Sequence, residues 1–123
     1  MEKKELYLKT AFCCMACDGD IAAEEMAKIK SMEYFKDIDD LEQKLNEYLA
    51  QLKEQGGQFL KCYLNELKTT QLTETEECEL VSIAIQTIEV DKVIEYNEVA
   101  FFKKIRRCLK SSDDTLLSVI QEN

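Results

Sequence analysis

No proline occurs in this chain of 123 residues, and only three glycines do. Both residues supply the backbone conformations of tight turns, so their scarcity argues against turn-rich all-β folds and disordered linkers. Apolar side chains instead recur every three or four residues, which is the period of an amphipathic helix. No segment alternates with a period of two for long enough to predict a strand. The sequence therefore predicts an all-α fold, and its length fits a single domain over residues 1–123.

The apolar pattern predicts about seven helices. Two segments, 5–17 and 74–89, carry apolar side chains on most of their circumference, which is typical of central, buried helices. The other helices are expected over 22–35, from 41 to the Gly56-Gly57 pair, over 58–67 and over 96–110. A short last helix, capped by residues 112–114, is expected to carry Leu116, Leu117 and Ile120.

Local signals refine these predictions. Residues 73–76, Thr-Glu-Thr-Glu, match the capping box, in which a Thr hydroxyl and a Glu carboxylate each satisfy a free backbone N–H. Residues 37–40 offer capping carboxylates to the helix that begins at 41. The helix over 96–110 is expected to bury one stripe, formed by Val99, Phe102, Ile105 and Leu109.

The two halves of the chain align with each other at a shift of 73 residues. Each half contains a buried helix, a turn that carries an Asp, and a Glu in the first turn of the next helix. We interpret this as an internal pseudo-repeat of two helix-turn-helix units, at about 5–35 and 78–110. The shift pairs Ala11 with Ala84, Asp18 with Asp91, Ile21 with Ile94, Glu25 with Glu98, Ala27 with Ala100 and Lys30 with Lys103.

Acidic residues in the two turns are candidate ligands for a divalent cation. They are Asp18, Asp20, Glu24 and Glu25 in the first unit, and Glu89, Asp91, Glu95 and Glu98 in the second. Carboxylates suit Ca²⁺ or Mg²⁺ better than Zn²⁺, and a chain without His has no His-containing zinc site. The spacing is not that of an EF-hand loop. The alternative is that these carboxylates only cap helices, whose N-terminal dipole favours acidic groups.

The first turn, Ala16-Cys17-Asp18-Gly19-Asp20-Ile21-Ala22-Ala23-Glu24-Glu25, resembles the Ala-Asp-Gly-x-Ile-x-x-x-Glu signature of the TerB-like tellurite-resistance family. That family also occurs as the N-terminal domain of membrane-anchored DnaJ-like co-chaperones. Residues 89–98 resemble its degenerate second copy, so the resemblance covers about 5–110. It implies a helical domain with pseudo-twofold halves, a non-enzymatic role in stress response and a protein partner, with membrane-associated complexes among the settings. It also implies metal-binding candidates at Asp18, Asp20, Glu25, Asp91 and Glu98.

Three residues depart from the family pattern. Cys17 stands where Ala is usual, and Ala22 stands where a capping Ser or Thr is common, so Glu25 lacks its reciprocal partner. Lys92 replaces the glycine of the second turn, and its ammonium disfavours a nearby cation. If only one unit binds metal, we expect the first.

The six cysteines suggest packing more than chemistry. Cys13, Cys14 and Cys17 lie close together, and residues 14–17 form a CxxC, but no second pair completes a four-ligand zinc site. The CxxC lies at the end of a helix, where the dipole opposes a thiolate. We expect reduced, buried cysteines that act as small hydrophobes, with a soft-metal role as the alternative.

Charge and missing motifs narrow the function. A net charge of −9 argues against nucleic-acid binding, and the absence of His excludes the Ser-His-Asp and Cys-His nucleophile systems. No phosphate-binding or dinucleotide motif occurs, so we expect no enzyme. A charged N-terminus and a longest apolar run of only seven residues, 11–17, predict no signal peptide, no transmembrane segment and a cytoplasmic location.

One basic cluster interrupts the acidic chain. Five bases follow one another closely near the end of the helix predicted over 96–110. The interpretation we favour is a favourable interaction with the C-terminal end of that helix. The alternative is a docking face for an acidic partner or an anionic lipid surface. The bases are Lys103, Lys104, Arg106, Arg107 and Lys110.

Overall fold

A computed structural model describes residues 3–17, 19, 21–90, 96–111 and 114, and it confirms the all-α prediction. Within these residues the chain forms six α-helices, one short 3-10 helix and no strand. The short helix predicted to follow the cap at residues 112–114 lies, apart from Asp114, outside the described residues. The elements are α1 (Lys3–Met15), α2 (Ala23–Ser31), η1 (Glu33–Phe35), α3 (Leu41–Gln55), α4 (Gly57–Thr69), α5 (Glu74–Val90) and α6 (Tyr96–Cys108).

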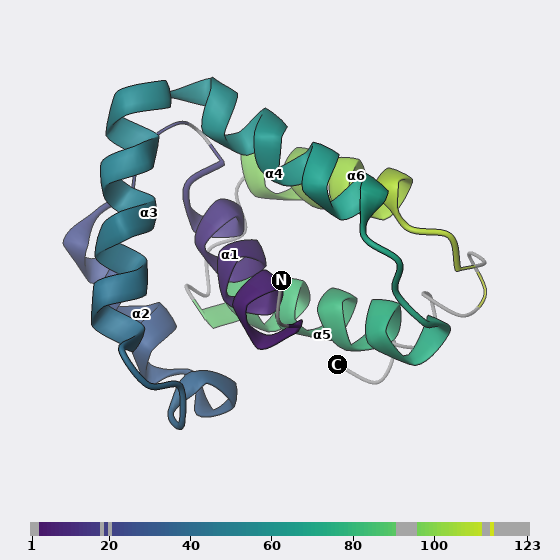
Figure 1. The fold of residues 1–123 in the computed structure, drawn as a ribbon, viewed down its shortest axis with the longest axis horizontal. Coiled ribbons are helices and arrows are strands. Elements are labelled where there is room, and N and C mark those ends of the chain that lie inside the picture. The colour runs from purple at the N-terminus through teal and green to yellow at the C-terminus, as the bar shows by residue number, and fades with distance from the viewer. Residues whose placement is uncertain (1–2, 18, 20, 91–95, 112–113, 115–123) are drawn as a thin grey trace.

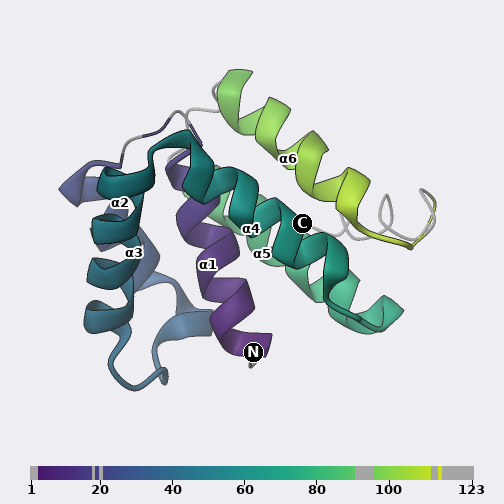
Figure 2. The ribbon, with the colours of Figure 1, turned by 45° about the horizontal axis from the view of Figure 1, so that its top comes forward.

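The helix α1 is the centre of the domain, as its apolar circumference predicts. Every residue from Leu6 to Met15 is buried, and α1 contacts all five other α-helices. Figures 1 and 2 show α1 surrounded by α3, α4, α5 and α6. Its most extensive partner is α5, the second helix predicted to be central, which buries Leu80, Ile83 and Ala84. One core therefore organises the described chain.

Two helix boundaries follow the predicted local chemistry. Gly56 adopts a φ of +58°, in the left-handed region that favours glycine, so α3 ends before it and α4 begins directly after it. The Thr73 N–H donates to Glu76 Oε1 at 2.9 Å, and the Glu76 N–H donates to Thr73 Oγ1 at 3.1 Å. This capping box starts α5 where the sequence predicts it.

One predicted helix end and one predicted helix cap are wrong, although α3 begins at Leu41 as predicted. The helix expected over 22–35 ends at Ser31, because Met32 is extended and the short helix η1 follows it. This break lets both Met32 and Phe35 enter the core. At the start of α3, Asp40 makes no side-chain cap, since its φ of 58° replaces the extended backbone that an N-cap normally has. Asp37 instead accepts a hydrogen bond from Lys4 Nζ at 3.0 Å.

The pseudo-repeat matches the helix positions but not their buried faces. The 73-residue shift places Ala23, the start of α2, on Tyr96, the start of α6. However, α2 buries Met26 and Ile29, whose counterparts are Val99 and Phe102, whereas α6 buries Glu98 and Phe101, each one position earlier. Only Ile105 keeps the alignment, since its counterpart Met32 is also buried. One position on a helix is a rotation of about 100°. The buried residues of α6 are Glu98, Phe101 and Ile105.

The predicted buried stripe of α6 is therefore wrong at its first residue, since Val99 is 39% exposed. Ile105 is fully buried, as predicted, while Phe102 and Leu109 are only half-buried. Contact with α4 gives the physical reason, because Phe101 stacks on Tyr63 of that helix with 6.2 Å between the ring centroids. The same rotation brings Glu98 inside and leaves Val99 outside.

Candidate functional site

The acidic turns, where the sequence predicts a cation site, are only partly described. Glu24 and Glu89 are exposed, Glu25 is half-buried, and Glu98 is 7% exposed. Among the described residues, no three Asp, Glu, Cys or His side chains form a group that could hold a metal ion. The cation site thus stays a prediction. The candidate ligands outside the described residues are Asp18, Asp20, Asp91 and Glu95.

Glu25 has a structural role. Its Oε1 accepts a hydrogen bond from the Ala22 N–H at 2.9 Å, which satisfies one free donor at the start of α2. Ala22 offers no side-chain acceptor in return, so only half of a capping box can form. Glu25 therefore acts as the capping alternative predicts.

Glu98 lies in a different environment from its counterpart Glu25. The rotation of α6 buries the Glu98 side chain, and the negative charge of Glu98 acts on Cys14 of α1. The pKa of the Cys14 thiol is raised first by burial, and then by the charges of Cys17 and Glu98. The two glutamates that align in the sequence are therefore not equivalent in their surroundings.

The cysteines are packed rather than poised for chemistry. None of the six forms a disulfide among the described residues, and Cys13 and Cys14 are buried. Burial raises the pKa of both thiols well above its ordinary value, whereas a redox or metal-binding cysteine needs a lowered thiol pKa. This confirms the prediction that Cys13 and Cys14 are small buried side chains of α1.

A partly buried ion pair that the sequence did not predict links α1 to α4. The Lys9 ammonium lies 3.0 Å from Glu66 Oε1 and 5.3 Å from the centroid of the Phe59 ring, with only 8% of Lys9 exposed. Next to it, the Thr10 and Tyr63 hydroxyls are 2.6 Å apart. Polar residues in a helix that is apolar all round need such partners when they are buried. The presence of Lys9 and Thr10 in this helix was therefore the sequence signal for these contacts.

A second unpredicted contact fastens the end of α6 to the start of α5. Glu77 is 4% exposed, although it lies in the first turn of α5. Its carboxylate accepts hydrogen bonds from the Lys110 N–H at 2.9 Å, from the Ser111 N–H at 2.7 Å and from the Ser111 hydroxyl. We name this set of bonds the Glu77 clasp. It is a structural device, because every bond serves the backbone or side chain of the segment after α6.

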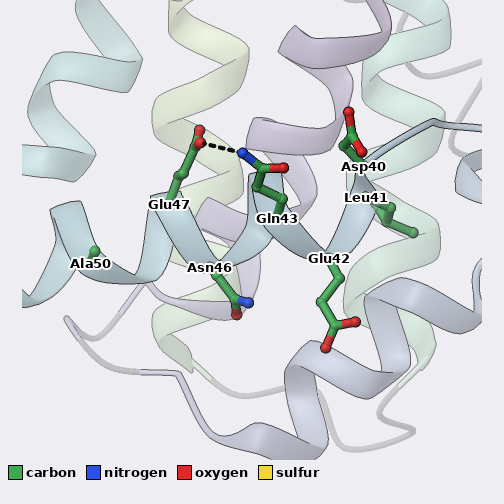
Figure 3. Close-up of a pocket in the computed structure, with 7 residues that line it drawn as sticks. All are labelled: Asp40, Leu41, Glu42, Gln43, Asn46, Glu47 and Ala50. Carbon is green, nitrogen blue, oxygen red and sulfur yellow. Dashed lines mark hydrogen bonds between the residues drawn. The ribbon is translucent and has the colours of Figure 1, made fainter.

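A shallow hollow on α3 has no convergent chemistry. The side chain of Gln43 donates to Glu47 at 3.4 Å, while Glu42 and Asn46 point to the other side of the helix (Figure 3). The polar groups therefore diverge, and all belong to α3 or to Asp40 just before it. We assign this hollow no function. Its lining consists of Asp40, Leu41, Glu42, Gln43, Asn46, Glu47 and Ala50.

Two deeper grooves differ in charge. A groove of about 300 Å³ beside the N-terminal ends of α1 and α3 has mixed charges, including the Lys4–Asp37 pair at 3.0 Å. A groove of about 360 Å³ between α4 and α6 has only basic charges, and we name it the basic groove. It is lined by Lys61, Leu64, Asn65, Lys68, Lys104, Arg107 and Cys108.

Within the part of the chain that the structure describes, no helix is long and apolar enough to cross a bilayer. The resemblance to the TerB-like family rests on residues 16–25 and on the degenerate copy at 89–98. No protein-family model, no curated protein and no solved structure matches this chain.

Proposed function

We propose that this chain is a non-enzymatic protein-interaction domain whose contact surface lies on α6. The observation that carries the proposal is the outward face of that helix. Tyr96 is 85% exposed and Val99 is 39% exposed, and no other large apolar side chain is exposed among the described residues. They are three residues apart, so they share one face of the helix.

The same face continues in basic residues. Lys103 and Arg107 lie seven and eleven positions after Tyr96, which places all three on one line along α6. Single exposed apolar residues are ordinary on protein surfaces. An exposed Tyr in line with an Arg is more specific, because these two residue types are enriched at the energetic centres of protein interfaces.

The proposal of a non-enzymatic role rests on the carboxylates and thiols that already have a role in the fold. Glu25 caps a helix, Glu77 forms the clasp, and the Cys13 and Cys14 thiols have raised pKa values. These groups are thus engaged in the fold rather than directed at a substrate. A TerB-like role in stress response, with a protein partner in the cytoplasm or at a membrane-associated complex, belongs to the same class and remains a proposal from the motif.

Site-specific photo-crosslinking in living cells tests this proposal. We expect Tyr96→benzoylphenylalanine to give one discrete adduct, identified by mass spectrometry, and Asn46→benzoylphenylalanine on the outer side of α3 to give none. Val99→Ser should weaken the adduct without lowering the melting temperature, because Val99 is exposed. Equal capture from both positions, or no adduct at position 96, would contradict the proposal.

A further inference from the structure

We infer that the basic groove binds an acidic segment of a partner protein, a short stretch with carboxylates on either side of an apolar residue. This inference rests on the proposed interaction function and adds the chemistry of the partner. Two features of the groove carry the inference, its basic charge and its apolar floor. A third is the net negative charge of the whole chain.

Four cations converge on the groove from two helices. Lys61 and Lys68 come from α4, and Lys104 and Arg107 come from α6, and all four are exposed. Figure 2 shows α4 and α6 running beside each other, and the two helices are in contact. The groove therefore brings Lys61 and Lys68 of α4 together with two bases of α6, whereas the sequence predicted a basic cluster on the last helix alone.

No carboxylate of the two helices neutralises these cations. The only acid of α4, Glu66, pairs with Lys9 of α1, and the only acid of α6, Glu98, is buried. None of the four groove cations forms an ion pair within the described residues. An external anionic group would thus meet four cations that no described carboxylate pairs with. The ion pairs that the structure describes use Lys3, Lys4, Lys9, Lys30, Lys36 and Lys44.

The floor of the groove is apolar. The Cys108 sulfur lies 3.6 Å from the Leu64 carbonyl oxygen across the α4–α6 contact, and 3.3 Å from the Lys104 carbonyl oxygen of its own helix. The side chains of Leu64 and Cys108 are half-buried, and burial raises the pKa of Cys108 despite the opposing charge of Lys68, so the thiol stays neutral. Leu64 and Cys108 therefore suit an aliphatic side chain, while the planar Arg107 fork suits a carboxylate.

The size of the groove and the charge of the whole chain favour a short protein segment. A volume of about 360 Å³ accommodates a few side chains. A nucleic acid or an anionic bilayer would bring an extended negative surface toward a chain of net charge −9. A short acidic segment avoids most of this repulsion, because charges more than about 8 Å apart are largely screened at physiological salt.

Direct titration tests the inference. The probe is a fluorescein-labelled helical peptide of about twelve residues with a leucine between pairs of glutamates, titrated into the full chain and followed by anisotropy. We expect binding that weakens as salt is added, and at least about a tenfold loss in the Lys104→Glu, Arg107→Glu double variant. The matched control is Lys36→Glu with Lys53→Glu, which changes the net charge equally on exposed residues away from the groove, and it should bind nearly as wild type.

A second readout locates the peptide on the chain. Bound peptide should slow alkylation of Cys108 but leave alkylation of the half-buried Cys62, on the same helix α4, unchanged. Mass spectrometry reports the two cysteines separately. Circular dichroism and thermal melting confirm that each variant is folded before its binding is compared.

Several outcomes would overturn the inference. They are no binding by the wild-type chain, equal losses in the groove and control variants, and unchanged alkylation of Cys108. Tighter groove-dependent binding of an oligothymidylate, or of vesicles that contain phosphatidylserine, would also overturn the choice of an acidic protein segment. If the adduct at position 96 persists in the groove variant, the interaction function stands and only the groove chemistry fails.

Discussion

At the scale of single residues, glutamate serves the fold in three ways. Glu25 accepts a hydrogen bond from a free N–H at the start of α2, and Glu66 pairs with a buried lysine. Glu77 collects the N–H groups of two successive residues. In each case a carboxylate satisfies a donor that burial or a helix end would otherwise leave unpaired. Part of the acidic excess is therefore structural.

The Glu77 clasp makes a sharp prediction. Replacing Glu77 by Ala removes the acceptor of three donors, and we expect a loss of about 2–3 kcal/mol in the free energy of unfolding. Hydrogen exchange should identify the cause, because the Lys110 and Ser111 amides should lose protection in the variant. As a control, Glu47→Ala on the exposed side of α3 should leave both amides protected. Unchanged exchange at both amides in Glu77→Ala would show that the clasp does not form in solution.

A neighbouring pair of glutamates tests the cap of α2. We expect Glu25→Ala to lower the free energy of unfolding by about 0.5–2 kcal/mol, since it removes the acceptor for the Ala22 N–H. Glu24→Ala alters the adjacent, exposed residue and should change stability little. Urea unfolding of both variants in buffer with EDTA checks this. Equal losses would mean that charge near the helix end matters more than the hydrogen bond.

At the scale of elements, the apolar period predicted where the helices lie in the sequence, but it did not predict reliably which face of each helix is buried. The apolar circumference of α1 and α5 predicted their central positions, and the Gly56-Gly57 pair and the capping box at Thr73 predicted real boundaries. The prediction of the buried face of α6 was wrong because two apolar stripes, one through Val99 and one through Phe101, have the same helical period. Only contact with Tyr63 of α4 decides between them. Helical period alone cannot contain that tertiary information.

The candidate site shows the same limit. The bases of α6 were visible in the sequence, but Lys61 and Lys68 belong to another helix and join them only through packing. The Glu77 clasp and the Lys9–Glu66 pair are long-range contacts between helices as well. Sequence spacing predicts which residues share a helix face, and it carries no signal for which faces meet.

The cation hypothesis also belongs to the scale of elements, and thermal melting tests it. If the two turns bind Ca²⁺ or Mg²⁺, either cation at millimolar concentration should raise the melting temperature above its value in EDTA, and Asp18→Ala should abolish the shift. If the acidic residues only cap helices, none of these cations should change the melting temperature. Zn²⁺ serves as the comparison, since the carboxylates favour the harder ions.

At the scale of the whole molecule, buried tyrosine hydroxyls and cysteine thiols make the free energy of unfolding depend on pH. Burial is the first cause of the raised pKa of Tyr48, Tyr63, Cys13 and Cys14. In the unfolded chain these groups lose their protons near the ordinary values of 10.0 for Tyr and 9.0 for Cys. The folded chain keeps the protons longer. The stabilisation is therefore complete below about pH 9 and declines as the pH rises further.

We expect the free energy of unfolding to fall by at least about 2 kcal/mol between pH 7 and about pH 10.5, as measured by urea titration. Tyr48→Phe should reduce this fall at little cost at pH 7, because the Tyr48 hydroxyl has no hydrogen-bond partner among the described residues. Tyr63→Phe should reduce it too, but at a cost of about 1 kcal/mol at pH 7, since it loses the contact with Thr10. A pH-independent stability would contradict the argument.

The central position of α1 has a consequence for how the chain is made. This helix leaves the ribosome well before its main partner, since α1 ends at Met15 and α5 begins at Glu74. At about 5–20 residues per second, α1 waits roughly 3–12 s with an apolar surface and no complete place to bury it. Nascent chains that stop before α5 should therefore be prone to aggregation and sensitive to proteases. The yield of correctly folded chain thus depends on keeping this helix from aggregating during synthesis.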